Sequence, residues 1–287
     1  MPIAYVVPDK RLRLDIAIVE IDSLHLHEDI VQELLRYLML TIKLNGYVKH
    51  PIIVDRKSLV VLDGVHRVVA LKKLGIHRVP ACLVNYSNPA IQVLNWYRTM
   101  TGASNIESAM SHVRKTACDV EKIGEVAEKM LGISPAVAAI RSRDWIFLIK
   151  CPFKSLQEDY KIIGKVEDRL KAIGVRIRYE TERDALEGLQ EGRVDAVMYT
   201  PKVTKDEILK SALSAHSFAW KATRHVVPAR PLNVNVPLRL LRARDRSLAQ
   251  VNRELRSMLL RKRLRRLPAG SVIDGRRYEE ELYVFEE

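Results

Sequence analysis

The sequence predicts a protein of the α/β (α+β) class with two domains. Its 287 residues exceed the roughly 100 to 200 residues of one typical domain. Two blocks of the chain each alternate short apolar runs, typical of strands, with segments whose apolar residues recur at helical spacing. We therefore expect a first domain over residues 1–100 and a second α/β domain over residues 101–287.

The first block predicts a small unit in which strands and helices are mixed. Its apolar runs are short and rich in β-branched residues, which favours strands. Gly46 and Gly75 follow segments of helical periodicity, where glycine suits a left-handed helix end. In chain order we expect a strand at 17–21, a helix at 30–44, strands at 51–55 and 58–62, a helix at 65–74 and a strand at 79–84.

The second block begins with a different pattern. We expect a helical hairpin over residues 104–131 and then a connector over 133–144, because Pro135 disfavours a regular element there. Beyond the connector the alternation returns. It predicts strands at 145–150, 175–179 and 196–199, separated by helices near 159–172 and 182–190.

Composition limits the class of protein. Hydrophobic residues make up 47% of the chain, but no apolar run approaches the about 20 residues of a membrane span. The N-terminus lacks the layout of a signal peptide, so we expect a cytoplasmic protein. Charged residues make up 29%, with many arginines and glutamates, a balance typical of thermophiles. Cys82, Cys118 and Cys151 are odd in number and far apart, so we expect buried thiols.

The net charge of +13 is concentrated near the C-terminus. Residues 239–266 contain eleven lysines and arginines but only two acidic residues, and their leucines recur at helical spacing. This pattern predicts a basic C-terminal helix over 239–266. Such a helix can bind phosphate backbones, or it can pack on its own domain with a solvated arginine face. We favour the second interpretation and expect no nucleic-acid partner, because the acidic chain end can neutralise the helix.

A strand-like apolar run turns directly into a helical pattern at Asp63, Gly64, Val65, His66 and Arg67. Glycine lets a ligand approach the backbone, and the first N–H groups of a helix together with its dipole favour phosphate. Asp63 is the anomaly, because a carboxylate repels phosphate unless a metal ion or a proton lies between them. The alternative is an ordinary turn with Asp63 as helix N-cap. His66 and Arg67 favour the phosphate site over the ordinary turn, because the first turn of a helix with only a structural role prefers acidic residues to basic ones.

A second polar cluster precedes the first predicted helix. Asp29 alone would serve as its N-cap, so His27 and Glu28 exceed what helix initiation requires. If this segment packs beside the Asp63 turn, Glu28 can act as a general base toward a hydroxyl group. The alternative is that His27 and Glu28 are exposed loop residues.

These residues carry a family resemblance. The first hundred positions resemble the ParB/sulfiredoxin fold, whose nucleotide-binding turn has the pattern Gly-x-His-Arg or Gly-x-x-Arg. Within that superfamily the chain is most similar to the free L-serine kinases. Their Asp-Gly-His-His-Arg is matched by residues 63–67 and their upstream His-Glu by His27-Glu28. Trp96 matches an aromatic residue of these kinases, and residues 223–228 match a late Thr-Arg-His-x-x-Pro segment that here runs on to Arg230-Pro231.

Departures from the superfamily patterns narrow the choice among the families of this superfamily. Val65 stands where the kinases have a first histidine, so only its backbone N–H is left to bind phosphate. Sulfiredoxins use a cysteine nucleophile at that position, and valine has no nucleophilic atom. Centromere-binding ParB proteins carry a helix-turn-helix after this fold, whereas the chain after Tyr97 gives way to an α/β block.

The resemblance implies a kinase that transfers the terminal phosphoryl group of ATP or ADP to the hydroxyl of free L-serine, giving O-phospho-L-serine. It also implies Mg²⁺ as cofactor and a place in cysteine biosynthesis. The sequence indicates no oligomeric state. Two alternatives stay open: a ParB-like nucleic-acid-binding protein or nuclease, and a regulator that binds a nucleotide without reacting.

The implied roles divide into three groups. Glu28 accepts the serine hydroxyl proton, and Asp63 holds magnesium or assists that transfer. The nucleotide phosphates are bound by Gly64, Val65, His66 and Arg67. In a substrate-binding loop over 220–231, Arg224 binds the serine carboxylate, Thr223 and His225 add hydrogen bonds, and Trp96 excludes water.

Overall fold

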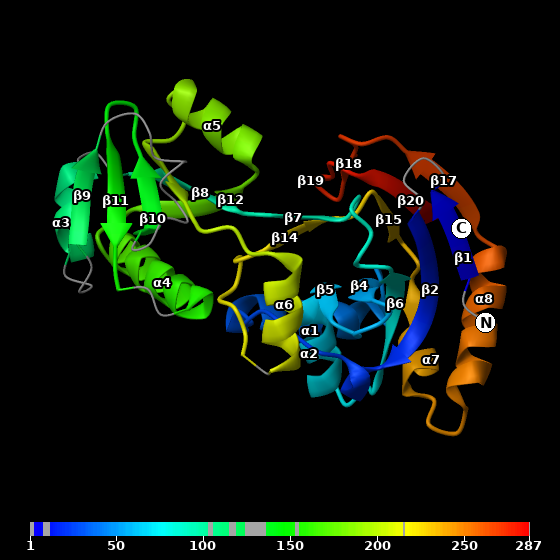
Figure 1. Cartoon of the computed structure of the whole chain (residues 1–287). Helices are drawn as coiled ribbons and strands as arrows, with labels where there is room; N and C mark the ends of the chain where they lie inside the picture. Colours follow the sequence, from blue (N-terminus) through cyan, green and yellow to red (C-terminus); the bar gives the residue numbers. More distant parts are fainter. Residues whose placement is uncertain are drawn as a thin grey trace. The chain divides into compact units, whose positions relative to one another are not determined.

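The computed structural model describes residues 3–7, 12–102, 106–114, 119–123, 136–152, 155–214 and 216–286. The chain forms two compact units (Figure 1). Unit 1 comprises residues 1–92, 209–216 and 225–287, and unit 2 comprises residues 93–208 and 217–224. Strands β7 (Gln92–Leu94) and β14 (Arg224–Val226) and helix α6 (Lys205–Leu213) lie where the chain passes from one unit to the other.

Unit 1 is built on a five-stranded sheet in which only the pairing of β4 with β6 is parallel. Its order is β1 (Ile3–Val7), β2 (Leu12–Glu20), β6 (Arg78–Val84), β4 (Ile52–Asp55) and β5 (Val61–Asp63). A short 3-10 turn (Ile21–Ser23) follows β2, and helices α1 (Gln32–Asn45) and α2 (Val65–Lys73) pack together. These elements confirm the predicted first block.

Helix α1 begins later than the sequence predicts. Its N-cap is Val31, which makes no side-chain cap, so the expected cap at Asp29 is wrong. The physical reason lies in the preceding segment. His25 pairs with Val60 in a parallel bridge, and this extended pairing holds the chain away from helical angles before residue 31. The predicted helix end at Gly46 is confirmed by its left-handed backbone, with φ of 73°.

The C-terminal segment completes unit 1 rather than unit 2. It forms β15 (Ala229–Leu232), β16 (Val236–Pro237), α7 (Leu238–Arg242), α8 (Leu248–Leu260), β17 (Arg263–Leu267), β18 (Val272–Ile273), β19 (Arg276–Arg277) and β20 (Glu281–Glu286). Strand β16 pairs with β3 (Tyr47–Val48), and Leu241, Leu255 and Phe285 join the core of the five-stranded sheet. The predicted division at residue 100 therefore differs from the compact units, because apolar contacts between distant segments define them.

The basic segment is not one helix, which corrects the prediction for residues 239–266. Helix α7 ends at Arg242, and Ser247 starts α8 with a capping box to Gln250. After Arg261 the chain enters β17, which pairs with β20. Likewise, the predicted loop over 220–231 is partly strand, because it contains β14 and β15.

Helix α8 packs on its own unit (Figure 1). Its apolar face, with Val251, Leu255 and Leu259, is buried, and the Asn252 side chain bonds both backbone groups of Ile18 on β2 at 2.8 and 2.9 Å. Several arginines of the segment pair with acidic residues: Arg239 and Arg246 with Glu254, Arg265 with Glu286, and Arg266 with Glu281. This arrangement agrees with the interpretation of a packed helix with a solvated arginine face.

Unit 2 is built on a six-stranded antiparallel sheet. Its order is β12 (Arg176–Glu180), β8 (Tyr97–Thr101), β13 (Ala196–Tyr199), β10 (Ala136–Arg141), β11 (Ile146–Lys150) and β9 (Asp119–Ile123). Helix α3 (Ile106–Arg114) packs against α4 (Leu156–Ala172), which also contacts β10 and β12, and α5 (Glu182–Gln190) packs against β8 and β13.

Two predictions for the second block are wrong. Residues 119–123 form strand β9 where a second hairpin helix was expected, and the predicted connector contains β10. In both places pairing with β11 decides the structure, because hydrogen bonding and packing within a sheet outweigh a weak local preference. The remainder of the predicted hairpin, residues 104–105, 115–118 and 124–131, lies outside the described residues.

The cysteines differ in state. Cys82 is a buried free thiol, as predicted, and its burial raises its pKa to about 12. Cys151 is disulfide-bonded, which corrects the expectation of a thiol there. Cys118 lies outside the described residues. Among the helices that the structure describes, none is long and apolar enough to cross a membrane.

Candidate active site

The predicted phosphate turn joins strand β5 to helix α2. Gly64 adopts φ of 102° and is the N-cap of α2. A Cβ atom at this position would lie 2.6 Å from Cγ2 of Ile52 and 2.9 Å from Nη2 of Arg67, so only glycine fits. The N-cap makes no side-chain hydrogen bond, which makes the alternative of Asp63 as an N-cap wrong. The first N–H groups of α2 and the helix dipole create a site for an anion.

Asp63 lies between two guanidinium groups. Its Oδ2 atom is 3.1 Å from Nη2 of Arg67 and 2.5 Å from Nη1 of Arg230. The Arg230 side chain is 6% exposed, and its Nε also donates to Glu280 at 2.6 Å. Burial lowers the pKa of Arg230, but Asp63 and Glu280 outweigh this and raise it above its usual range. Two positive charges thus offset the repulsion between the Asp63 carboxylate and a phosphate.

Arg67 is held in place by the loop before β4. Its Nη1 atom donates to the carbonyl oxygens of His50 at 2.9 Å and Pro51 at 2.5 Å. The side chain is only 18% exposed. Arg67 therefore supplies a fixed positive charge at the turn.

His66 has a structural contact that the sequence did not indicate. Its Nε2 atom accepts a hydrogen bond from the backbone N–H of Val31 at 2.9 Å. The ring thereby connects the first turn of α2 to the start of α1. Any hydrogen bond from the His66 ring to a phosphate would have to come from Nδ1.

His27 and Glu28 lie beside β5, because residues 24–28 follow that strand. The N–H of His25 donates to Leu59, and the N–H of Val61 donates to His25. His27 is 1% exposed, and its Nδ1 donates to the Val61 carbonyl at 2.8 Å. The Nε2 atom of His27 lies 4.0 Å from Oε1 of Glu28, whose side chain is 16% exposed. The alternative of an exposed loop is therefore wrong.

The His27 ring is neutral. Burial lowers its pKa, although Glu28, the Val61 carbonyl and Asp63 act in the opposite direction. Because a carbonyl oxygen can only accept, the ring proton is on Nδ1.

His225 joins the same cluster in unit 1. Its ring contacts the His27 ring edge to face, with centroids 5.5 Å apart, and its Nε2 lies 2.8 Å from the hydroxyl of Tyr86. Tyr86 is held by its backbone N–H, which donates to Asp55 at 3.0 Å. Glu28, Asp63 and His225 thus all belong to the surroundings of His27.

Trp96, Thr223 and Arg224 belong to unit 2. The Cζ atom of Arg224 lies 5.7 Å from the centroid of the Trp96 ring, and Nζ of Lys221 lies 3.7 Å from it. Thr223 is buried. The structure therefore brings Trp96 and Arg224 together, as the assigned roles require, and adds Lys221.

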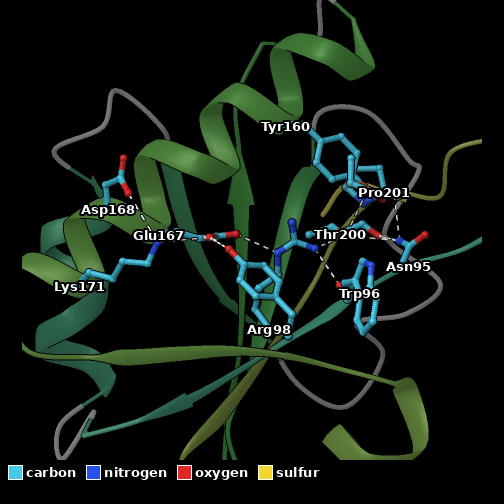
Figure 2. Close-up of polar contacts among 11 residues, drawn as sticks. Asn95, Trp96, Arg98, Tyr160, Glu167, Asp168, Lys171, Thr200 and Pro201 are labelled. Carbon is cyan, nitrogen blue, oxygen red and sulfur yellow. Dashed lines mark hydrogen bonds and ion pairs between the residues drawn. The ribbon is translucent and has the colours of Figure 1, made fainter. Parts of the chain in front are cut away.

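A rigid set of polar contacts supports Trp96 (Figure 2). The Trp96 carbonyl accepts from Nη1 of Arg98 at 2.7 Å, and Nε of Arg98 donates to Glu167 at 2.9 Å. Beside Trp96, the Asn95 amide donates to the carbonyl oxygens of Thr200 at 2.6 Å and Pro201 at 2.9 Å. Because Arg98 and Glu167 are almost completely buried, the backbone at Trp96 is fixed.

The sequence assigned no individual role at the site to Tyr86, Arg230 or Glu280. Arg230 continues the Thr-Arg-His-x-x-Pro segment, and that continuation was the only available signal. Tyr86 and Glu280 had no local signal, because their partners are distant in the chain.

A metal site made only of protein ligands is absent from the described residues, where no group of three or more His, Cys, Asp or Glu side chains could hold an ion. Magnesium in phosphoryl-transfer sites needs only one or two carboxylates, with phosphates and water as the other ligands. The donor set therefore fits a magnesium ion that binds together with a nucleotide.

The chain is similar to proteins of known activity, although no protein-family model matches it. It is 29% identical over 243 residues to an ATP-dependent L-serine kinase of Staphylothermus marinus, covering 81% of this chain and 93% of that protein. It is 26% identical to the ADP-dependent L-serine kinase of Thermococcus kodakarensis, covering 82% and 95%. A ParB-like protein of Sulfolobus acidocaldarius is 36% identical over 66 residues, 23% of this chain and 33% of that protein.

Comparison of the fold with solved structures also finds a serine kinase. A free serine kinase in complex with AMP, a variant in which one glutamate is replaced by alanine, superposes with a TM-score of 0.69 at 25% identity. The match covers 79% of this chain and 94% of the kinase. The predicted fold class and the resemblance to free L-serine kinases are thereby confirmed.

Proposed function

We infer that this chain is a kinase that phosphorylates free L-serine, with ATP or ADP as the phosphoryl donor. The observation that carries this conclusion is that one unit pairs the segment of His27 and Glu28 with the chain at β5, which leads into the Asp63–Arg67 phosphate turn. The surrounding chain is similar over about four fifths of its length to L-serine kinases that use ATP or ADP. In the reaction the serine hydroxyl oxygen bonds to the terminal phosphorus, the bond to the leaving phosphate breaks, and O-phospho-L-serine forms.

The nucleotide phosphates bind at the start of α2. Backbone N–H groups at Val65 and His66 point outward from the first helical turn, and Gly64 allows close approach. Arg67 and Arg230 add positive charge beside Asp63. Phosphoryl transfer depends mainly on positioning and on charge stabilisation, and these groups supply both.

Glu28 accepts the proton of the serine hydroxyl. Its Oε1 atom lies 4.0 Å from Nε2 of the buried His27 ring, and the Glu28 side chain is 16% exposed, so the carboxylate is held in place and still accessible. This arrangement supports Glu28 as the general base. A protein that merely senses a nucleotide would gain nothing from a carboxylate held in this way, and catalysis is therefore favoured over sensing.

Asp63 would hold Mg²⁺ that enters with the nucleotide. The ion would neutralise charge that develops on the phosphate oxygens during transfer. The hydrogen bonds from Arg67 and Arg230 to Oδ2 fix the direction of the Asp63 carboxylate. Asp63 thus contributes an oriented carboxylate oxygen.

Serine is bound by residues of the Thr223–His225 segment and by Trp96. Arg224 pairs with the serine carboxylate, Thr223 and His225 add hydrogen bonds, and the Trp96 ring excludes water. The contact of the Arg224 guanidinium with the Trp96 ring supports a joint role for these two residues. We further propose a cytoplasmic enzyme from a thermophile whose product supplies cysteine biosynthesis.

Phosphorus NMR tests this function directly. Purified protein is incubated with L-serine and Mg²⁺, and with ATP or ADP in separate samples. Formation of O-phosphoserine in either sample supports the proposal and identifies the donor. If neither sample yields O-phosphoserine while nucleotide binding is intact, the kinase assignment is wrong and a regulator that binds nucleotide takes its place.

A further inference from the structure

The segment that carries Glu28 is held at both of its ends. At the first end, the buried His27 ring donates from Nδ1 to the Val61 carbonyl on β5 at 2.8 Å. At the second end, the backbone N–H of Val31 donates to Nε2 of His66 on α2 at 2.9 Å. Three residues of the chain lie between these two anchors. Because the reach of so short a span is small, the two anchors limit where the Glu28 backbone can lie.

The two anchors belong to the two elements that the phosphate turn joins. Strand β5 ends at Asp63, and α2 follows Gly64 directly. His27 therefore fixes the segment to the strand before the turn, and His66 fixes it to the helix after the turn. The position of Glu28 consequently depends on the geometry of the turn itself.

Helix α1 cannot fix its own beginning with a side chain. Its N-cap is Val31, whose side chain has no polar atom and makes no cap bond. The Val31 carbonyl accepts from the N–H of Leu35 at 3.0 Å, which is an ordinary bond of the first helical turn. The N–H of Val31 is bound by the His66 ring instead. His66 thus supplies the side-chain contact that defines where the Glu28 segment enters α1.

The His66 ring can make two contacts at the same time. Because Nε2 accepts from the Val31 N–H, the ring proton is on Nδ1. Nδ1 can therefore donate to a phosphate bound at the start of α2 while Nε2 holds Val31. A nucleotide that fixes the ring through Nδ1 consequently also fixes one end of the Glu28 segment.

We propose that His66 is a positioning residue for Glu28 and acts through its hydrogen bond to the Val31 backbone. This inference rests on the proposed function, since it concerns the general base of that reaction. The helix that binds the nucleotide thereby also places the base. Misplacing a reacting group by about 1 Å can lower the rate about a hundredfold, so loss of this hydrogen bond acts on kcat.

The test compares His66→Asn with His66→Gln at saturating nucleotide and serine, so that weaker binding does not affect the rate. The side-chain oxygen of glutamine extends about as far as Nε2, whereas asparagine is one carbon shorter and does not reach Val31. We expect His66→Asn to lower kcat about ten- to hundredfold and His66→Gln to recover most of it. The control Lys73→Gln, on an exposed position of α2, leaves kcat unchanged.

Amide hydrogen exchange, measured by NMR, tests the contact without any need for activity. Loss of the hydrogen bond predicts that the Val31 amide exchanges about tenfold faster in His66→Asn, while His66→Gln keeps its protection. The amide of Leu71, in the middle of α2, is the internal control for the fold. Its exchange rate should be the same in both variants and in the unaltered protein.

The other outcomes decide against the inference. Full kcat in His66→Asn would remove His66 from the placement of Glu28. An equal loss of kcat in the two variants would assign the effect to the phosphates alone. Unchanged exchange at Val31 in His66→Asn would show that the ring does not hold this amide. If the unaltered protein forms no O-phosphoserine, the proposed function fails, and Val31 exchange still tests the contact.

Discussion

Arg230 connects the C-terminal segment to the phosphate turn, because its Nη1 lies 2.5 Å from Oδ2 of Asp63 while its Nε lies 2.6 Å from Glu280. Arg230 and Asp63 are 167 positions apart in the chain. Both side chains are buried, with 6% of Arg230 and 7% of Glu280 exposed. The fold of the C-terminal segment thus determines the direction of a carboxylate at the proposed active site.

Replacing Arg230 by methionine should destabilise unit 1 strongly. The substitution leaves two carboxylates in a poorly solvated place without their shared partner, and breaking a buried ion pair costs about 3–5 kcal/mol. Urea unfolding measures this loss. Lys72→Met is the control, because Lys72 pairs with Asp22 at the surface, and exposed pairs contribute at most about 1 kcal/mol. Equal losses in the two variants would show that Arg230 does not hold the charge network.

Gly64→Ala should abolish nucleotide binding and also lower the stability of unit 1. Its Cβ would meet Ile52 at 2.6 Å while the backbone stays at φ of 102°. Gly46→Ala is a matched control, because Gly46 also has positive φ, 73°, but a Cβ there would meet nothing within 4 Å. The control is expected to lose about 1–2 kcal/mol from backbone strain alone. Gly64→Ala should lose clearly more, and calorimetric titration with ADP should detect no binding. If ADP binding persists, the phosphates lie elsewhere.

Glu28→Gln should abolish turnover without weakening nucleotide binding. Glutamine keeps the shape of the side chain but cannot accept the hydroxyl proton, and general base catalysis contributes about a hundred- to ten-thousandfold in rate. The kcat is therefore expected to fall by at least about a hundredfold, while the Kd for ADP changes less than twofold. Glu33→Gln, on an exposed position of α1, controls for loss of one negative charge. A Glu28→Gln variant with full kcat would exclude Glu28 from proton transfer.

The sequence predicted the parts of the site that depend on local pattern. Gly64 is recognisable because a strand-like run, a glycine and a helical pattern follow one another directly. Arg230 and Glu280 were not recognised as part of the site, since a lone arginine and an acidic chain end acquire their meaning only when distant segments meet. For the same reason β9 and β10 were missed: their identity as strands comes from pairing with β11.

The protonation of His50 should make unit 1 less stable in acid. Burial, followed by the charges of Arg67 and Lys49, lowers the pKa of His50 from 6.5 to about 4. Its Nδ1 accepts a hydrogen bond from the backbone of Asn233 at 3.1 Å, which a neutral ring allows. Between pH 4 and 6.5 the unfolded chain binds the proton that the folded chain excludes. The neutral His50 ring therefore makes its full contribution to the free energy of unfolding above pH 6.5, and this contribution is lost as the pH falls toward 4.

The comparison that isolates this effect uses His50→Gln. Glutamine does not titrate, and its side-chain oxygen can still accept from Asn233. The difference in unfolding free energy between the unaltered protein and His50→Gln should shift by up to about 3 kcal/mol between pH 7 and pH 4, in favour of the variant in acid. Urea unfolding at several pH values measures it. If the difference in unfolding free energy between the two proteins does not depend on pH, the folded protein binds the His50 proton as readily as the unfolded chain. Burial beside Arg67 would then not lower the pKa of His50.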